Sequence, residues 1–285
     1  MDEASVRSRV EIEEATDLIA ESLRPAAPLP PSAPWHLHLD PPATGALNMA
    51  LDQALLDRAE REGVTTLRLY SWSPHCLSLG RNEPALKRYN RAHIEARGIA
   101  TVRRPTGGRA VWHARELTYA VAAPLSRFGG LAGAYREIHL LLADALKQLG
   151  AEATLAPPPA RASSLSAGAC FATSAGGELL VSGVKIVGSA QLTQGSAFLQ
   201  HGSVLLQDGQ SLLAELGPAR VTHAPGAHLS GILDRVVEWS EAATAVSAAA
   251  TRRWGDPVTN GHVEAVTPAP AQVERFLDPR WTWRR

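Results

Sequence analysis

The clearest helical pattern in the chain lies between residues 135 and 149. Apolar side chains recur there at intervals of three and four positions, and Gly150 follows the last of them. This spacing places the apolar side chains on one stripe of a helix, and glycine commonly follows a helix end. The same periodicity predicts further helices at 45–56, 88–97, 210–216 and 239–254, with a short one within 268–285.

Short apolar runs, several of them alternating with polar residues, predict strands along the middle of the chain. The predicted strands are 35–39, 66–72, 75–79, 99–102, 117–122, 179–181, 184–187, 189–193 and 197–206. Ser182-Gly183 is a two-residue turn between two of these runs, so we expect a β-hairpin across 178–188. Because strands cluster centrally and helices flank them, we expect an α+β fold with a mixed β-sheet flanked by helices.

A proline-rich stretch separates the N-terminal residues from the rest of the chain. Residues 1–24 have the composition of a polar helix, and five prolines follow within residues 24–34. Proline at this density favours an extended linker. We therefore expect residues 1–34 to be an N-terminal appendage with its linker, and residues 35–285 to be one folded domain.

The overall charge and the cysteine content narrow the class of protein. Lysine plus arginine and aspartate plus glutamate both number 28, so the formal net charge is zero and nothing global indicates nucleic-acid binding. Two cysteines make no disulfide framework, which favours a reducing, cytoplasmic setting. The chain has no apolar run of about 18 residues and no signal-peptide pattern at its start, so we expect no membrane association.

A basic loop with two adjacent glycines joins the predicted strands 99–102 and 117–122. Gly107 and Gly108 let the backbone approach a ligand closely, and Arg104 and Arg109 supply planar donors for carboxylate or phosphate groups. Adjacent glycines are also a common turn signal, so a β-hairpin with an exposed basic turn is the alternative. By itself, the loop predicts an anion-binding site.

Cys170 is the candidate nucleophile, because a thiolate attacks acyl groups well at neutral pH. It follows a loop at 156–168 that is rich in proline, serine and alanine, and loops commonly present reactive groups. The alternative is a small core residue, as free cysteines usually are. Cys76 lies within an apolar strand, and we interpret it as such a core residue.

Three further polar residues lie in or beside predicted strands. Strand alternation turns Lys185 away from the face of its apolar neighbours, toward solvent or toward a site where it donates to a carbonyl oxygen. His113 and His201 each follow an apolar segment, and singly each is interpreted as a structural histidine. No histidine–carboxylate pair has zinc-ligand spacing, and no phosphate-loop or dinucleotide motif is present.

Three ordered blocks of this sequence resemble the biotin/lipoate A/B protein ligase family. They are residues 103–113, 183–191 and 199–203, with supporting matches at 48–52 and 78–81. The resemblance implies a ligase-like catalytic domain across 35–285. It also implies a substrate-binding set, namely Arg104, Thr106, Gly107, Gly108, Arg109, Ala110, His113, Gly188, Ser189, Ala190, Gln191, His201 and Gly202.

The family contains two chemistries, and the residues favour one of them. ATP-dependent lipoate ligases form an acyl-adenylate, whereas octanoyltransferases take the acyl chain from acyl carrier protein through a cysteine thioester. The surroundings of Cys170, upstream of Lys185, resemble the nucleophile loop of LipM-type octanoyltransferases. Ligases usually carry a third glycine where this chain has Arg109. The chain also has Ala114 where an acidic residue often follows the family's histidine.

The resemblance therefore implies an acyltransferase of protein lipoylation with Cys170 and Lys185 as catalytic residues. Cys170 accepts octanoyl from octanoyl-acyl carrier protein, and a lysine of a lipoyl domain then accepts it. That acceptor is the H protein of the glycine cleavage system or a dehydrogenase E2 domain. An acidic carrier would suit the arginines near the mouth, which are Arg81, Arg103, Arg104 and Arg109.

The same resemblance sets the remaining expectations. No metal or tightly held cofactor is needed, and ATP enters only in the alternative of an ATP-dependent lipoate–protein ligase. Two further alternatives are an amidotransferase that moves octanoyl between lipoyl domains and a non-catalytic acyl-binding protein. We expect a cytoplasmic monomer that binds neither nucleic acid nor membranes.

Overall fold

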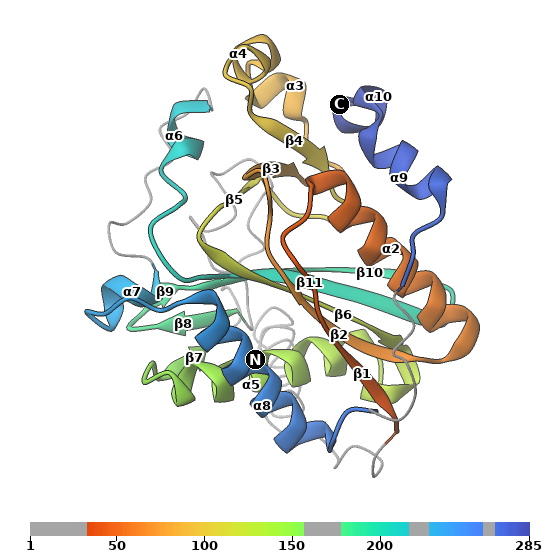
Figure 1. The fold of residues 1–285 in the computed structure, drawn as a ribbon, viewed down its shortest axis with the longest axis vertical. Helices are drawn as coiled ribbons and strands as arrows, with labels where there is room; N and C mark the ends of the chain where they lie inside the picture. The colour runs from red at the N-terminus through yellow and green to blue at the C-terminus, as the bar shows by residue number, and fades with distance from the viewer. Residues whose placement is uncertain (1–32, 157–177, 217–227, 259–265) are drawn as a thin grey trace, which may run out of the picture. The chain divides into compact units, whose positions relative to one another are not determined.

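The structure is a computed structural model that describes residues 33–156, 178–216, 228–258 and 266–285 (Figure 1). The predicted polar helix at 1–24, nearly all of the proline-rich linker and Cys170 lie outside the described residues. The domain boundary after residue 34 therefore stays a prediction.

A five-stranded sheet forms the centre of the fold. Its strand order is β1-β2-β6-β11-β10, in which β1 runs parallel to β2 and the other neighbours are antiparallel. The prediction of a mixed sheet flanked by helices is thus confirmed. The bounds are β1 Trp35–Leu39, β2 Thr65–Tyr70, β6 Glu116–Pro124, β10 Val187–Gln194 and β11 Ala197–Leu205.

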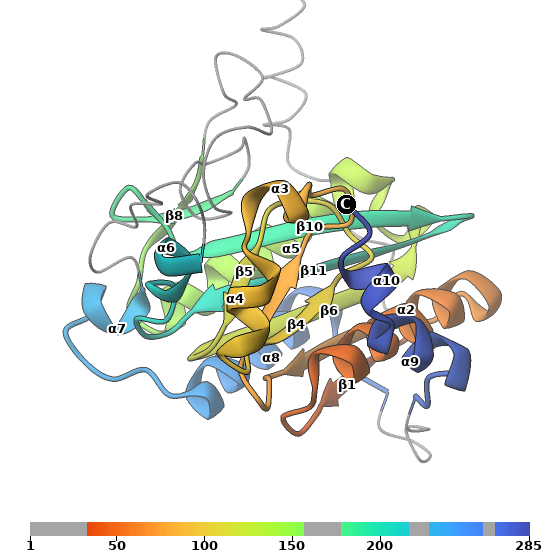
Figure 2. The ribbon, with the colours of Figure 1, turned by 90° about the horizontal axis from the view of Figure 1, so that it is seen from above.

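Helices cover both faces of this sheet. The long helix α2 (Gly45–Glu62) packs on β6 and β11, while α5 (Leu131–Gln148) and α8 (Trp239–Trp254) pack against each other on the opposite side (Figures 1 and 2). The Thr44 side chain caps the start of α2, and Gly63 ends it with a φ of 68°. A left-handed conformation of this kind is accessible to glycine without steric cost.

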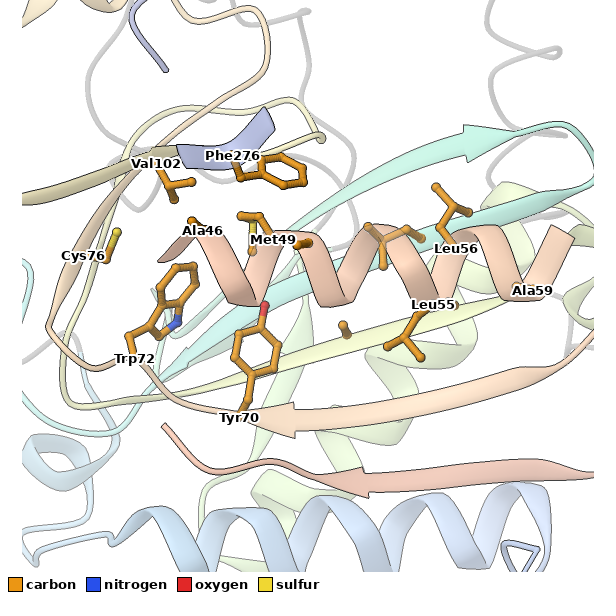
Figure 3. Close-up of a cluster of buried hydrophobic side chains, with 14 of the residues drawn as sticks. Ala46, Met49, Leu55, Leu56, Ala59, Tyr70, Trp72, Cys76, Val102 and Phe276 are labelled. Carbon is orange, nitrogen blue, oxygen red and sulfur yellow. The ribbon is translucent and has the colours of Figure 1, made fainter. Parts of the chain in front are cut away.

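The hydrophobic core lies between α2, the sheet and the C-terminal helices. Met49 and Leu56 of α2 are almost fully buried, and Phe276 of α9 (Pro270–Leu277) belongs to the same cluster. Figure 3 shows Phe276 and Val102 on one side of α2, with Tyr70 and Trp72 on the other. The C-terminal segment is therefore part of the core, although it is distant from α2 in sequence.

A second, three-stranded sheet excludes the hairpin alternative for the glycine loop. Its order is β4-β3-β5, with β4 (Ala100–Arg103) parallel and β5 (Val111–His113) antiparallel to β3 (Cys76–Leu79). The glycine loop therefore crosses the end of β3 and does not close a hairpin between its two flanking strands. Backbone hydrogen bonds tie the loop to that end, from Arg104 N–H to the Leu79 carbonyl (3.0 Å) and from Arg81 N–H to the Thr106 carbonyl (2.8 Å).

The third sheet contains the predicted hairpin. Strand β8 (Leu179–Val181) pairs with β7 (Ala153–Leu155) and with β9 (Val184–Lys185). Ser182 and Gly183 form its turn, and their φ angles are 51° and 76°. Two successive positive φ angles match the right-handed twist of paired strands, so this prediction is confirmed.

Several element boundaries differ from the prediction. The helix expected at 88–97 is two short helices, α3 (Ala85–Arg88) and α4 (Arg91–Ala96), because Asn90 caps the second through its side chain. The expected helix 45–56 continues to Glu62, since no breaking residue precedes Gly63. The remaining elements are η1 Leu125–Phe128, α6 Leu212–Leu216, α7 Leu229–Ile232 and α10 Pro279–Thr282.

Candidate functional site

A cavity lies where α2, the glycine loop, the five-stranded sheet and the β4-β3-β5 sheet meet. Counted together with the open solvent at its mouth, its space amounts to about 420 Å³. Met49, Trp72 and Val111 provide apolar wall, and backbone of Gly108, Gly188 and Gly202 completes it. The lining residues are Met49, Tyr70, Trp72, Ser78, Arg104, Gly108, Val111, His113, Thr118, Gly188, Ser189, Ala190, His201, Gly202 and Ser203.

One side of the cavity is built on a buried aspartate–histidine pair. His201 Nδ1 lies 2.8 Å from Asp52 Oδ2, and His201 Nε2 lies 2.6 Å from Thr106 Oγ1. Burial alone would raise the pKa of Asp52, but hydrogen bonds from His201 and Tyr70 and the charge of Arg68 together lower it. Asp52 is therefore an anion that orients the imidazole of His201.

His201 is held neutral by its surroundings. Burial lowers the pKa of His201, and this effect exceeds the opposing hydrogen bond and charge of Asp52. The Nδ1–H then donates to Asp52, so Nε2 accepts from the Thr106 hydroxyl. Thr106 accordingly supports the site from behind His201 and is not itself a lining residue.

A second buried pair, of His113 with Glu116, also supports the cavity wall. His113 Nδ1 lies 2.6 Å from Glu116 Oε1, and His113 Nε2 lies 2.6 Å from Ser78 Oγ. Trp72 stacks on the imidazole with ring centroids 3.9 Å apart. The family often has an acidic residue at the position of Ala114, and in this chain Glu116, two residues later, supplies a carboxylate. Both ring nitrogens of His113 and of His201 have a partner, as in a structural histidine, and both residues also line the cavity.

The arginines of the glycine loop are more buried than expected. Arg103 donates to the carbonyls of Gly80, Glu83 and Thr282, and it is fully buried. Arg104 donates to both Ser78 oxygens and to the Gly107 and Arg109 carbonyls.

The expectation that Arg103 and Arg104 face a carrier protein is therefore wrong. The crossing loop leaves carbonyl groups that no strand satisfies, and these two guanidinium groups satisfy them. Arg81 is exposed and Arg109 is half-buried, so these two still reach the surface.

Lys185 does not point to solvent. Its side chain is buried, and Nζ lies 2.6 Å from Glu178 Oε1, which is buried as well. The alternative that Lys185 faces solvent is wrong, because the chain continues from β9 into the first residues of β10, which are buried. Lys185 is not itself a lining residue of the cavity, but Gly188, three positions later, is one.

The described chain stops and resumes beside this ion pair. The Ala156 N–H donates to the Glu178 carbonyl over 2.7 Å, so the two ends of the undescribed stretch 157–177 meet there. Cys170 belongs to that stretch and lies outside the described residues. Its role as a nucleophile stays a prediction.

Most predicted binding residues converge on the cavity, and the others support it. Gln191 donates to the Leu131 carbonyl and to Gln200, while Ala110 is fully buried beneath the loop. Gly107 and Arg109 present carbonyls to Arg104. The predicted residues that line the cavity are Arg104, Gly108, His113, Gly188, Ser189, Ala190, His201 and Gly202.

The sequence analysis did not identify several residues of the cavity wall, nor Asp52 and Glu116, the carboxylates that pair with the two histidines. Met49 and Asp52 lie in the block 48–52, and Ser78 begins the block 78–81, so the family resemblance contained a signal for them. No pattern identified Trp72 or Glu116, because their contacts join segments that are distant in sequence. Cys76 is a core residue as predicted, and burial raises the pKa of its thiol to about 12.

In the described ranges, we find no helix with both the length and the apolar composition that crossing a membrane requires.

Comparison with known proteins identifies the family of the chain. Residues 44–251 match the lipoyl protein ligase A/B catalytic domain. The chain is 36% identical to octanoyltransferase LipM of Symbiobacterium thermophilum over 77% of its own length and 86% of that enzyme. It is 42% identical to octanoyltransferase LipM of Kyrpidia tusciae over 56% of its length, and the match spans only 61% of that relative.

A solved structure of lipoate-protein ligase A bound with ATP shares the fold. It superposes with a TM-score of 0.68 at 18% identity, over 88% of this chain and 98% of the ligase. At this identity the likeness concerns the fold alone.

Proposed function

Because the chain belongs to the lipoyl protein ligase A/B catalytic domain family, we propose that it is an octanoyltransferase of lipoate biosynthesis. The observation that carries the proposal is the apolar cavity, in which the guanidinium group of Arg104 is occupied by oxygens of its own chain. A nucleotide triphosphate needs cationic donors at such a loop, whereas an acyl chain needs apolar wall. The relatives named octanoyltransferase LipM support the same choice.

The reaction proceeds in two acyl transfers. The Cys170 thiolate attacks the thioester carbonyl of octanoyl-acyl carrier protein, the bond from that carbon to the carrier sulfur breaks, and the carrier leaves as a thiol after protonation. The neutral ε-amine of a lipoyl-domain lysine then attacks octanoyl-Cys170. An amide forms, the amine proton is lost, and the Cys170 thiol is regenerated.

Lys185 assists both transfers by its charge. A buried ammonium group favours the thiolate form of a nearby cysteine and stabilises the oxyanion that forms on the attacked carbonyl. Glu178 holds this ammonium group at 2.6 Å and offsets the cost of burying it. Cys170 lies eight residues before Glu178, so the chain spans at most roughly 28 Å between them.

The acyl chain occupies the cavity described above. Each methylene that leaves water contributes about 0.8 kcal/mol, so a chain of eight carbons gains several kcal/mol from the wall formed by Met49, Trp72 and Val111. Backbone amides at Gly107-Gly108 and Gly188-Ser189 are suited to face the carbonyl end. A well-placed donor of this kind typically contributes about 3 kcal/mol to transition-state stabilisation.

The partners follow from this chemistry. The donor is octanoyl-acyl carrier protein, and the acceptor is a lipoyl domain of the glycine cleavage H protein or a dehydrogenase E2. We further propose that the protein is a cytoplasmic monomer. The two widely separated cysteines, which suit a reducing compartment, support the location.

Intact mass spectrometry after mixing with octanoyl-acyl carrier protein, without ATP, tests the function. We expect a covalent octanoyl adduct that hydroxylamine removes, and we expect Cys170→Ala to abolish it. Cys76→Ala is the matched control, because Cys76 is the other cysteine of the chain, is buried and should leave the adduct intact.

Other outcomes would identify the alternatives. Transfer that requires ATP and survives Cys170→Ala would mean a lipoate–protein ligase. Octanoyl taken only from an octanoylated lipoyl domain would mean an amidotransferase. Binding of octanoate or lipoate without any transfer would leave a non-catalytic acyl-binding protein.

A further inference from the structure

Exposed arginines from three separate segments gather near the C-terminus. We call Arg81, Arg275, Arg284 and Arg285 the C-terminal basic surface. Arg81 follows β3, Arg275 lies on α9, and the last two end the chain; all four are exposed. Figures 1 and 2 both show the C-terminus beside α3 and α10.

Specific contacts hold these arginines together. The guanidinium carbons of Arg275 and Arg284 lie 3.9 and 4.1 Å from the Trp281 ring centroid. The Trp281 indole N–H donates to the Arg103 carbonyl over 2.8 Å, and Arg284 donates to the Arg81 carbonyl over 2.5 Å. The side chains of Arg275 and Arg284 are therefore preorganised around Trp281, and little of their conformational entropy remains to be lost when they bind a partner.

The positive charge of this surface is weakly compensated by the chain itself. Burial, and then the charges of Arg285, Arg81 and Arg275, lower the pKa of Arg284. Beneath the surface, the fully buried Arg103 has an Nη2 without a hydrogen-bond partner among the described residues. Because the charges of neighbouring arginines repel one another, a bound anion would stabilise this surface.

The acids near this surface have other partners. Asp57, whose charge opposes the lowering of the pKa of Arg275, accepts from three glutamines, which are Gln53, Gln194 and Gln272. Glu83 is buried and accepts from the Gly80 N–H, Arg88 and Tyr89. Asp278 accepts from Arg280, which lies outside the defined surface. These contacts leave the charge of the basic surface directed outward.

The basic surface adjoins the loop that lines the cavity. The Arg81 N–H donates to the Thr106 carbonyl, and a Cβ placed on Gly80 would lie 1.9 Å from the Gly108 carbonyl oxygen. Gly108 and Arg104 both line the cavity. Beside the arginines, Leu86 is 53% exposed and its N–H bonds to the Arg285 carbonyl. Apolar area among positive charges is typical of a protein-docking face.

We propose that the C-terminal basic surface docks the acidic face of the acyl carrier protein that donates octanoyl. This inference rests on the proposed function, since it names where that donor binds. Charge complementarity at an interface rim raises the association rate and lowers the apparent KM, and salt weakens both effects. The surface orients the donor so that its acyl group reaches the cavity beside the glycine loop.

Comparing two octanoyl donors tests this surface. One donor is octanoyl-acyl carrier protein and the other is the octanoyl thioester of N-acetylcysteamine, which lacks the protein. We expect the double variant Arg81→Glu/Arg284→Glu to raise the KM for the carrier donor about tenfold or more and to flatten its salt dependence. The KM for the small thioester should stay within about twofold, since the cavity is unchanged.

A matched control has the same change in charge elsewhere. Arg61→Glu/Arg252→Glu alters exposed arginines on α2 and α8, and both KM values should remain those of the wild type. Calorimetric binding of carrier protein to each variant gives a readout that does not depend on turnover. Circular dichroism verifies that all variants are folded.

The outcomes separate this inference from the proposed function. If the wild type transfers octanoyl and both double variants behave alike, the docking surface is wrong while the function stands. If no donor is used but carrier binding still requires Arg81 and Arg284, the function is wrong while the surface stands. A raised KM for the lipoyl domain alone, or loss only of binding to a short DNA duplex, would also overturn the inference.

Discussion

Three buried histidines share one protonation pattern around the cavity. In His113, His139 and His201, Nδ1 faces an acceptor, which is Glu116, the Tyr135 carbonyl or Asp52 respectively. Each Nε2 faces a hydroxyl group, which belongs to Ser78, Ser189 or Thr106. A neutral imidazole with Nδ1–H satisfies both contacts at once. Burial lowers the pKa of His139 and of His201, so these two imidazoles favour the neutral form that this arrangement needs.

His139 makes the stability depend on pH. Burial, and to a lesser degree the charge of Lys185, lowers the pKa of His139 to about 4, although the Tyr135 carbonyl opposes the shift. The unfolded chain therefore binds a proton near pH 6.5 that the folded chain does not. Above about pH 6.5, His139 therefore leaves the free energy of unfolding unchanged. As the pH falls toward 4, His139 lowers the free energy of unfolding progressively, by about 3 kcal/mol in total.

Urea unfolding at several pH values between 4 and 7 measures this effect. His139→Gln should flatten the decline of the unfolding free energy by that amount, because glutamine does not titrate. His93→Gln, at an exposed position on α4, should keep the decline of the wild type. Parallel curves for wild type and His139→Gln would contradict the assignment.

At the scale of elements, the turn after β3 and the glycine loop are packed as one unit. A Cβ on Gly80 would lie 1.9 Å from the Gly108 carbonyl oxygen, whereas a Cβ on Gly107 would meet nothing within 4 Å. Glycine is therefore needed at Gly80, because two parts of the backbone approach each other closely there. The loop holds its course by this contact and by the donors of Arg104.

Alanine substitution distinguishes the two glycines. Gly80→Ala should displace the loop from the cavity wall and lower octanoyl transfer by about tenfold or more, since backbone atoms cannot yield as a side-chain end can. Gly107→Ala should lower transfer less than Gly80→Ala does, because a Cβ at Gly107 meets nothing within 4 Å and leaves the loop in place. Rates of adduct formation with the small octanoyl thioester measure both, and equal effects would show that the packing contact is unimportant.

For the whole molecule, the C-terminal segment completes the core. Phe276 is 2% exposed and packs with residues of α2, while its neighbour Leu277 is 63% exposed. The segment also binds Arg103 at two points. The Trp281 indole N–H donates to the Arg103 carbonyl, and the Arg103 guanidinium group donates to the Thr282 carbonyl. The last helices thus connect the core to the second sheet and to the glycine loop.

The neighbouring side chains on α9 provide a matched pair of variants. Phe276→Ala should lower the free energy of unfolding by about 3–5 kcal/mol, because it leaves a cavity in the core. Leu277→Ala should change it by less than about 0.5 kcal/mol. Denaturant unfolding followed by circular dichroism measures both, and a small effect of Phe276→Ala would mean that α9 is not integral to the core.

Local patterns predicted much of the fold. The stripe at 135–149 and the turn at Ser182-Gly183 each involve neighbours in sequence, and α5 and the β8–β9 hairpin appear where expected. The break at Asn90 was missed because a capping side chain outweighed the apolar period. The hairpin alternative for the glycine loop failed because pairing of β4 and β5 with β3 is a long-range choice.

The sequence alone determined the family, the mixed sheet flanked by helices and most residues of the cavity, because these depend on local periodicity and on contiguous motifs. Only the tertiary structure decided that Arg103 and Arg104 satisfy carbonyls of their own chain and that Lys185 is paired with Glu178. The burial of a charge depends on which distant segments cover it and which partners they bring. Strand alternation assigns a side chain to a face, and only packing determines what that face meets.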